Sequence, residues 1–121
     1  MAGTVTADDF ATGTRAAVRG GTTTIVDFGT QYEGESLADG LRNWHEKADG
    51  KCSCDYGFHM SISDWNPSVS RELDDMMEAG ITSFKLYMTY DTQVDDKTIL
   101  KSCAGLRRWE ESPEFTVRTA V

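Results

Sequence analysis

Two strand-like segments of this 121-residue chain, each apolar on one side and polar on the other, constrain its fold most. Side chains alternate across a strand, so the segment 54–62 places Phe58, Met60 and Ile62 on one side and polar residues on the other. The segment 81–90 shows the same alternation. An open doubly wound sheet buries apolar residues on both of its faces, and this pattern does not fit it. It favours a (β/α)8 barrel, whose outer face meets helices and whose inner face can line a site.

Helix-like segments separate the strand-like ones. Strands are expected over 22–28, 54–62 and 81–90. Helices are expected over 7–19, 37–49, 67–79 and 96–109, with Thr6, Ser36, Asn66 and Asp95 or Asp96 as their capping residues. This alternation predicts βα units and a parallel sheet. Because a complete barrel needs roughly 250 residues, the expected fold is α/β, about three consecutive units of a partial (β/α)8 TIM barrel.

Composition narrows the function classes. The net charge of -8 repels nucleic acid and anionic membrane surfaces on average, and no apolar run approaches the roughly 18 residues that span a bilayer. The N-terminus lacks the pattern of a signal peptide. The cysteines show no framework spacing, which indicates reduced thiols in the cytoplasm: Cys52, Cys54 and Cys103.

Lys85 is the leading candidate for a reactive or metal-binding side chain. It lies in mid-strand between Phe84 and Leu86, where a buried ammonium is costly unless it is paired or loses its proton. A neutral buried lysine can react with carbon dioxide, and the resulting carbamate can bridge two divalent metals. On the residues alone a second interpretation stays open, in which Lys85 extends to the strand end and pairs with an acid such as Asp91.

Other polar residues have two interpretations each. Tyr90 is expected to end the strand of Lys85, where its phenol could stabilise an oxyanion or be a solvated rim group. His59 is either a metal ligand or, more commonly, a strand histidine satisfied by an acid such as Asp55. His45 is expected in water on the exposed side of a helix. Asp27 could bind a metal, but a structural acid inside the barrel is the commoner case.

Several runs from about Gly3 to Leu100 follow one pattern: TVTADDF, GTRAAVRGGTTTIVDF, WHEKADGK, DYGFHMSI and EAGITSFKLYMTYD. They resemble the dihydropyrimidinase and D-hydantoinase family of cyclic amidohydrolases, most specifically through GITSFKLYMTY. The resemblance implies that Lys85 is carboxylated and bridges two metal ions, usually zinc. It also implies that Tyr90 binds the substrate and stabilises the tetrahedral intermediate. Neither His45 nor His59 matches a family ligand.

The resemblance implies an enzyme that opens a dihydropyrimidine or hydantoin ring to an N-carbamoyl amino acid. A metal-activated hydroxide would attack the ring carbonyl while Tyr90 supports the oxyanion. The implied cofactors are two divalent metal ions and carbon dioxide for carboxylation of the lysine. The implied partners are a small cyclic amide and, in a homotetramer, further copies of the parent chain.

The resemblance ends at Lys101, so residues 1–100 are assigned to a barrel fragment and 101–121 to a divergent tail. The family's other metal ligands match no part of the chain, which would therefore be inactive alone. Codons that encode SCAGLRRWEESPEFTVRTA at 102–120 can, one base earlier, encode VLRRAAALGGITGVHCENG. That sequence is an amphipathic helix, a glycine stop and a strand with a family-like ligand motif, which predicts a frameshift.

Two other functions stay open. Collapsin-response mediators share the fold as non-catalytic interaction proteins, but the presence of both Lys85 and Tyr90 argues against that class. A sister hydrolase such as allantoinase or dihydroorotase would act on another ring. The isolated chain would expose its first and third strands as open edges, which predicts a poorly soluble or molten species.

Overall fold

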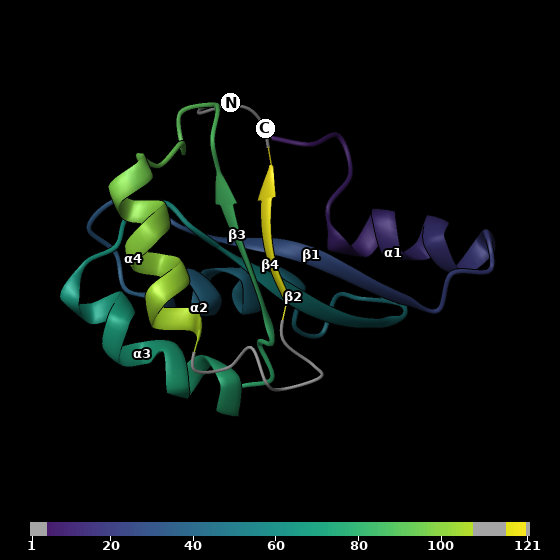
Figure 1. Cartoon of the computed structure of the whole chain (residues 1–121). Helices are drawn as coiled ribbons and strands as arrows, with labels where there is room; N and C mark the ends of the chain where they lie inside the picture. The colour runs from purple at the N-terminus through teal and green to yellow at the C-terminus, as the bar shows by residue number, and fades with distance from the viewer. Residues whose placement is uncertain (1–4, 108–115, 121) are drawn as a thin grey trace.

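The computed structural model describes residues 5–107 and the backbone of 116–120, which alternate between helix and strand (Figure 1). The helices are α1 (Phe10–Arg19), α2 (Leu37–Ala48), α3 (Pro67–Glu78) and α4 (Asp96–Leu106). The strands are β1 (Thr24–Gln31), β2 (Asp55–Ile62), β3 (Ser83–Tyr87) and β4 (Thr116–Ala120). The alternation expected from the sequence is therefore present, and β4 is a further strand that was not predicted.

The described strands form one parallel sheet in the order β1-β2-β3-β4. β1 pairs with β2 along its whole length, whereas β2 and β3 pair through Met60–Phe84 and Ser61–Lys85. Sequential parallel strands joined by helices are the arrangement of a (β/α)8 barrel. The outermost strands are β1 and β4, so the prediction that the third strand is an open edge is wrong.

Local chemistry accounts for where the helices begin. Three predicted caps are confirmed, because each accepts a hydrogen bond from a backbone N–H of the first turn: Ser36, Asn66 and Asp95. α1 begins later than expected, because Asp9 rather than Thr6 caps it. The Asp9 carboxylate accepts hydrogen bonds from the backbone N–H and the hydroxyl of Thr12, which completes a capping box. The Thr12 N–H, the larger contribution, holds the pKa of Asp9 below its usual value.

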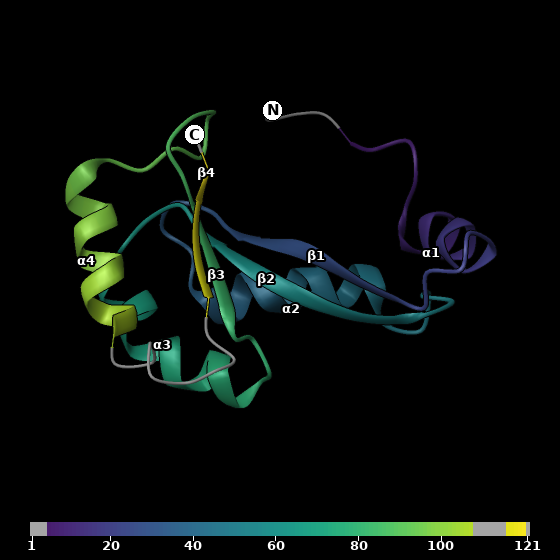
Figure 2. The ribbon, with the colours of Figure 1, turned by 45° about the vertical axis from the view of Figure 1, so that its right-hand side comes forward.

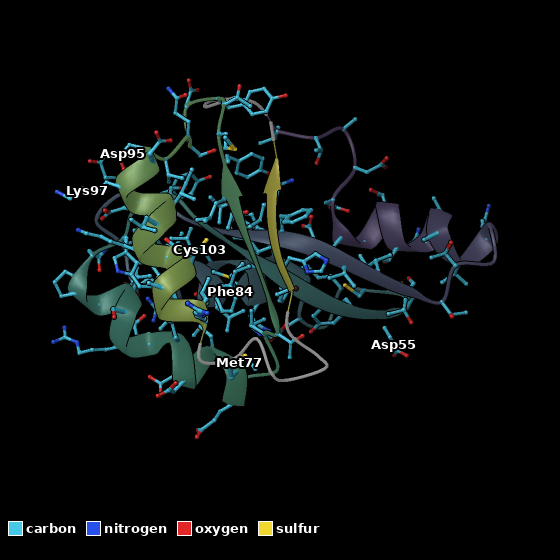
Figure 3. The ribbon with its side chains drawn as sticks, viewed as in Figure 1. Asp55, Met77, Phe84, Asp95, Lys97 and Cys103 are labelled. Carbon is cyan, nitrogen blue, oxygen red and sulfur yellow. The ribbon has the colours of Figure 1, made fainter. Side chains whose placement is uncertain are left out.

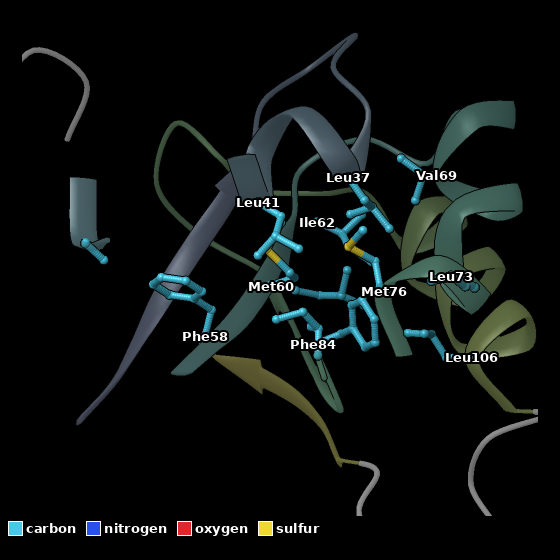
Figure 4. Close-up of a cluster of buried hydrophobic side chains, with 13 residues drawn as sticks. Leu37, Leu41, Phe58, Met60, Ile62, Val69, Leu73, Met76, Phe84 and Leu106 are labelled. Carbon is cyan, nitrogen blue, oxygen red and sulfur yellow. The ribbon is translucent and has the colours of Figure 1, made fainter. Parts of the chain in front are cut away.

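The core lies between the sheet and helices α2, α3 and α4 (Figure 4). Its largest fully buried apolar side chains are Leu37, Met60, Ile62, Val69, Leu73, Phe84, Leu86 and Leu106. Burial of each side chain of this size stabilises the fold by roughly 1.5–3 kcal/mol. Gly40 lets α2 approach β1 closely, since a Cβ there would lie 3.1 Å from the carbonyl oxygen of Thr30.

The two faces of the sheet differ as the alternation predicted. Helices α2, α3 and α4 lie along the outer face, toward which Phe84 points from β3 (Figures 2 and 3). The opposite, inner face is left open by the described helices (Figure 2). Val26 of β1 lies on the inner face with 51% of its surface exposed. The candidate site must therefore be sought on this inner face and at the carboxyl ends of its strands.

Candidate functional site

Side chains from β1, β2 and β3 meet on the inner face. The Nζ atom of Lys85 lies 4.3 Å from the ring centroid of Phe28 and 4.4 Å from that of Tyr87. The ring of His59 lies 5.0 Å from that of Phe28. A cation close to an aromatic face is attracted by the ring quadrupole, so these contacts fix the lysine side chain over the face. Lys85 is half-buried and lies on the polar side of β3, which confirms its predicted orientation.

The sequence predicted that Tyr90 ends the strand of Lys85. In the structure Tyr90 instead lies on a turn after β3. β3 ends at Tyr87, and Tyr90 has a backbone φ of 69°, which is uncommon for a residue other than glycine. The carbonyl of Tyr90 accepts a hydrogen bond from the N–H of Gln93 at 3.1 Å, which closes the turn. The ring packs edge-on against Tyr87 at 6.2 Å, and 58% of the residue is exposed. The phenol is therefore accessible beyond the carboxyl end of the strand that carries Lys85.

The two histidines lie in different environments. Nδ1 of His59 contacts the hydroxyl of Ser83 on the neighbouring strand. His45 was expected to be surrounded by water. Its Nδ1 instead lies 2.9 Å from Oδ1 of Asp49. The hydroxyl of Tyr56 donates to the same Asp49 oxygen at 2.6 Å. The bond from Tyr56, which has the larger effect, and the bond from His45 hold the pKa of Asp49 below its usual value. This cluster near the amino end of β2 is structural, because it lies away from the rim.

Asp27 points to the outer face of the sheet. Its carboxylate accepts a hydrogen bond from the indole N–H of Trp44 on α2, at 3.2 Å. The expectation that Asp27 lies inside the barrel is therefore wrong. Because side chains alternate along β1, Val26 and Phe28 take the inner face, and Asp27 links the strand to α2.

Gln31, which sequence reasoning did not single out, holds two loops together at the carboxyl ends of β1 and β2. Its fully buried amide group donates to the carbonyl oxygens of Tyr32 at 2.7 Å and Glu35 at 2.9 Å. Its oxygen accepts from the N–H groups of Ser63 at 3.0 Å and Asp64 at 3.3 Å. One side chain thus fixes loop 32–36 against loop 63–66, at the edge where barrel enzymes bind their substrates.

Potential metal ligands are sparse in the described residues. They contain no group of three or more His, Cys, Asp or Glu side chains that could hold a metal ion. Lys85 and His59, both considered as ligands from the sequence, lie on the described inner face, each next to the ring of Phe28. The described cysteines are free thiols, and burial raises the pKa of Cys52.

Known proteins are similar in sequence to this chain over most of its length. The D-hydantoinase of Streptomyces coelicolor is 54% identical over 102 residues, which cover 83% of this chain and 22% of that protein. The dihydropyrimidinase of Dictyostelium discoideum is 47% identical over 89 residues, which cover 73% of this chain and 18% of that protein. The chain belongs to the D-hydantoinase and dihydropyrimidinase family. No family profile matches the chain.

The fold agrees with this family. The structure of D-hydantoinase from a Bacillus sp. AR9 superposes with a TM-score of 0.88 at 46% sequence identity, covering 98% of this chain and 26% of that one. The prediction of a partial (β/α)8 barrel is thereby confirmed. The chain spans about a quarter or less of the length of these relatives, from 18% of the Dictyostelium discoideum protein to 26% of the Bacillus one. No helix in the described part of the chain is long and apolar enough to span a membrane.

Proposed function

We propose that this chain is part of a hydrolase that opens a cyclic amide, a dihydropyrimidine or a hydantoin, to an N-carbamoyl amino acid. The observation that carries the proposal is the position of Lys85 on the open inner face, with Tyr90 accessible beyond the end of the same strand. The identity of 54% to a D-hydantoinase supports it. The parent protein would act on a small ring in the cytoplasm as a homotetramer.

Lys85 would be this chain's ligand for the metal ions. Its half-buried amine lies on the open face, so carbon dioxide can reach it. Carboxylation of the neutral amine forms a bond between Nζ and the carbon of carbon dioxide, and the nitrogen releases one proton. The resulting anionic group has two oxygens, which suit a bridge between two divalent ions such as zinc. When bound, such ions polarise a carbonyl and lower the pKa of a water molecule.

The remaining ligands must come from parts of the parent outside the described residues, which contain no metal-binding group of their own. Within the chain, the rings of Phe28 and Tyr87 flank the lysine and limit its movement. Gln31 keeps two loops of the same rim in place. These residues would position the groups that react without taking part in the chemistry.

Tyr90 would support the oxygen that gains charge when the ring carbonyl is attacked. Its phenol is exposed and can donate a hydrogen bond to that oxygen. A donor that acts in the transition state contributes a rate factor of about 10²–10³. We therefore expect Tyr90→Phe in the active protein to lower kcat by about that factor, with metal content little changed.

A chimera tests the proposal with this chain's own residues. In it, residues 5–100 replace the matching segment of the Streptomyces coelicolor D-hydantoinase. We expect the chimera to bind zinc and to hydrolyse hydantoin or dihydrouracil. Lys85→Ala should remove most of the metal and the activity, and bicarbonate should not restore them. Lys97→Ala, which changes an exposed lysine on α4 (Figure 3), is the matched control and should keep both.

The result that defeats the assignment of Lys85 is a Lys85→Ala chimera with full metal content and full activity. A chimera that binds zinc but opens neither ring would exclude both proposed substrates and favour a sister hydrolase. The isolated chain should open neither ring, since it supplies one ligand of the proposed set.

A further inference from the structure

Ser61 of β2 carries a polar group that the described fold does not use. Its side chain is fully buried, and its hydroxyl has no hydrogen-bond partner among the described residues. Burial of a hydroxyl without a partner is unfavourable, so such a group calls for an explanation. We propose that Ser61 is a positioning residue, whose hydroxyl donates a hydrogen bond to the carbamate of carboxylated Lys85. This inference rests on the function proposed above.

The register of the sheet places Ser61 directly beside Lys85. The two residues are Cα partners on β2 and β3, and both side chains point to the inner face. Neighbouring strands lie about 4.8 Å apart, so the side chains of such partners are neighbours. Two residues earlier on each strand, Nδ1 of His59 contacts the hydroxyl of Ser83. Inner-facing side chains of β2 and β3 therefore do meet across the two strands.

The amine of Lys85 lies over β2, close to the row of Ser61. Its Nζ is 4.3 Å from the ring centroid of Phe28, which belongs to β1 on the other side of β2. The two side chains therefore meet above the strand that carries Ser61. Phe28 is in register with His59, one row before Ser61 on this face. Nζ is also 4.4 Å from the ring centroid of Tyr87, one row after Lys85, so the two rings bracket the amine at the level of Ser61.

Carboxylation changes what Lys85 offers to this hydroxyl. Nζ forms a bond to the carbon of carbon dioxide, and the proton that Nζ loses passes to water. The side chain becomes longer and ends in two acceptor oxygens that share a negative charge. A hydrogen bond to a charged acceptor is stronger than one between neutral groups. The hydroxyl of Ser61 would therefore favour the carboxylated form of Lys85 and orient its oxygens.

The bicarbonate requirement for zinc uptake tests this role in the chimera that carries residues 5–100. The chimera is freed of metal and carbon dioxide, and its zinc content is then measured at several bicarbonate concentrations. Ser61→Ala should raise the bicarbonate concentration for half-maximal zinc content at least about tenfold, because a hydrogen bond to a charged group supplies a factor of that size. Ser61→Thr keeps the hydroxyl and should keep the wild-type midpoint.

Ser63→Ala is the matched control in the same chimera. It removes a second buried hydroxyl without a described partner, from a residue just beyond the end of β2 and out of register with Lys85. We expect its bicarbonate midpoint to equal that of the wild type. Carbon-13 NMR of chimeras loaded from labelled bicarbonate follows the carbamate itself, and its signal should give the same order of midpoints.

The unfolding temperature separates the proposed role from a merely structural one. Without metal and carbon dioxide the hydroxyl of Ser61 has no partner, so Ser61→Ala should not lower Tm. In the zinc-loaded chimera the same variant should lower Tm, because it loses a hydrogen bond that exists only with the carbamate. Equal losses of Tm in both states would make Ser61 a structural residue and overturn the proposal.

Failure of this inference differs from failure of the proposed function. If the chimera takes up zinc without bicarbonate, or if Lys85→Ala takes it up like the wild type, no carbamate forms and both proposals are wrong. If uptake needs bicarbonate and Lys85, but Ser61→Ala has the same midpoint as Ser63→Ala, the function stands and the role of Ser61 is overturned.

Discussion

Ser102 is a position where a single substitution should stabilise the chain. Its side chain is fully buried on α4, and no hydrogen-bond partner for its hydroxyl exists among the described residues. A buried hydroxyl without a partner costs about 1–3 kcal/mol. Ser102→Ala removes the oxygen, and alanine also favours the helix by up to about 0.7 kcal/mol. We expect the free energy of unfolding to rise by about 1–3 kcal/mol.

Ser70→Ala is the matched control, because it makes the same change at an exposed position in α3. The difference between the two variants then isolates the effect of burial from that of helix propensity. Urea unfolding of both variants at one protein concentration measures this difference, since self-association shifts apparent stability. If Ser102→Ala is no more stable than Ser70→Ala, the reasoning is refuted. The hydroxyl would then have a partner, such as the carbonyl one turn earlier in the helix.

The remaining predictions concern acid, packing and the gene. In the folded chain the pKa of Asp9 lies below its ordinary value of 3.8, so its stabilising effect is complete above that pH and is lost as the pH falls through the folded pKa. Asp9→Asn should therefore flatten the acid end of a plot of unfolding free energy against pH, and an unchanged slope would contradict this. Gly105→Ala should lower Tm, because its Cβ would lie 2.6 Å from two ring atoms of Trp65. Gly13→Ala, with 3.7 Å to its nearest neighbour, should raise Tm through helix propensity of up to about 1 kcal/mol; equal gains from both would rule out the close contact. Sequencing of codons 100–121 should reveal a neighbouring frame that encodes a GITGVHCEN-like strand, and the frameshift hypothesis fails without one.

The packing around α4 favours the neighbouring reading frame at one position and the observed sequence at another. The neighbouring frame places valine at position 102, which suits the full burial of Ser102. It places arginine at position 105, where Trp65 approaches Gly105 too closely for any larger side chain. The nucleotide sequence is therefore the decisive test of the tail.

Features that depend on local chemistry could be predicted from the sequence. The alternation in β2 and β3 gave the two faces of the sheet, because side chains in any strand point to alternate sides. The caps Ser36 and Asn66 were found because a cap and its N–H partners are close in the chain. The cap of α1 was misplaced, because Thr6 and Asp9 both precede the helix and the reciprocal bonds with Thr12 decide between them.

Features that depend on distant contacts or on an unusual backbone could not be predicted. The run that follows β3 has strand-like residues, yet β3 ends at Tyr87 and the chain turns at Tyr90, which adopts a left-handed conformation. The direction of Asp27 depends on Trp44, a residue of the next helix. The burial of Gln31 depends on a loop more than thirty residues away.

The bonds of Gln31 have a consequence for how this rim can change in evolution or in design. Loops at the carboxyl ends of barrel strands are commonly treated as separate units that can be lengthened or exchanged one at a time. Here loops 32–36 and 63–66 both bond to the buried amide group of Gln31. An insertion in either loop would displace a backbone partner of Gln31 and so disturb the bonds that hold the other loop. The two loops should therefore change together. A mutant library of this rim should vary both loops at once or keep Gln31 and its four backbone partners unchanged.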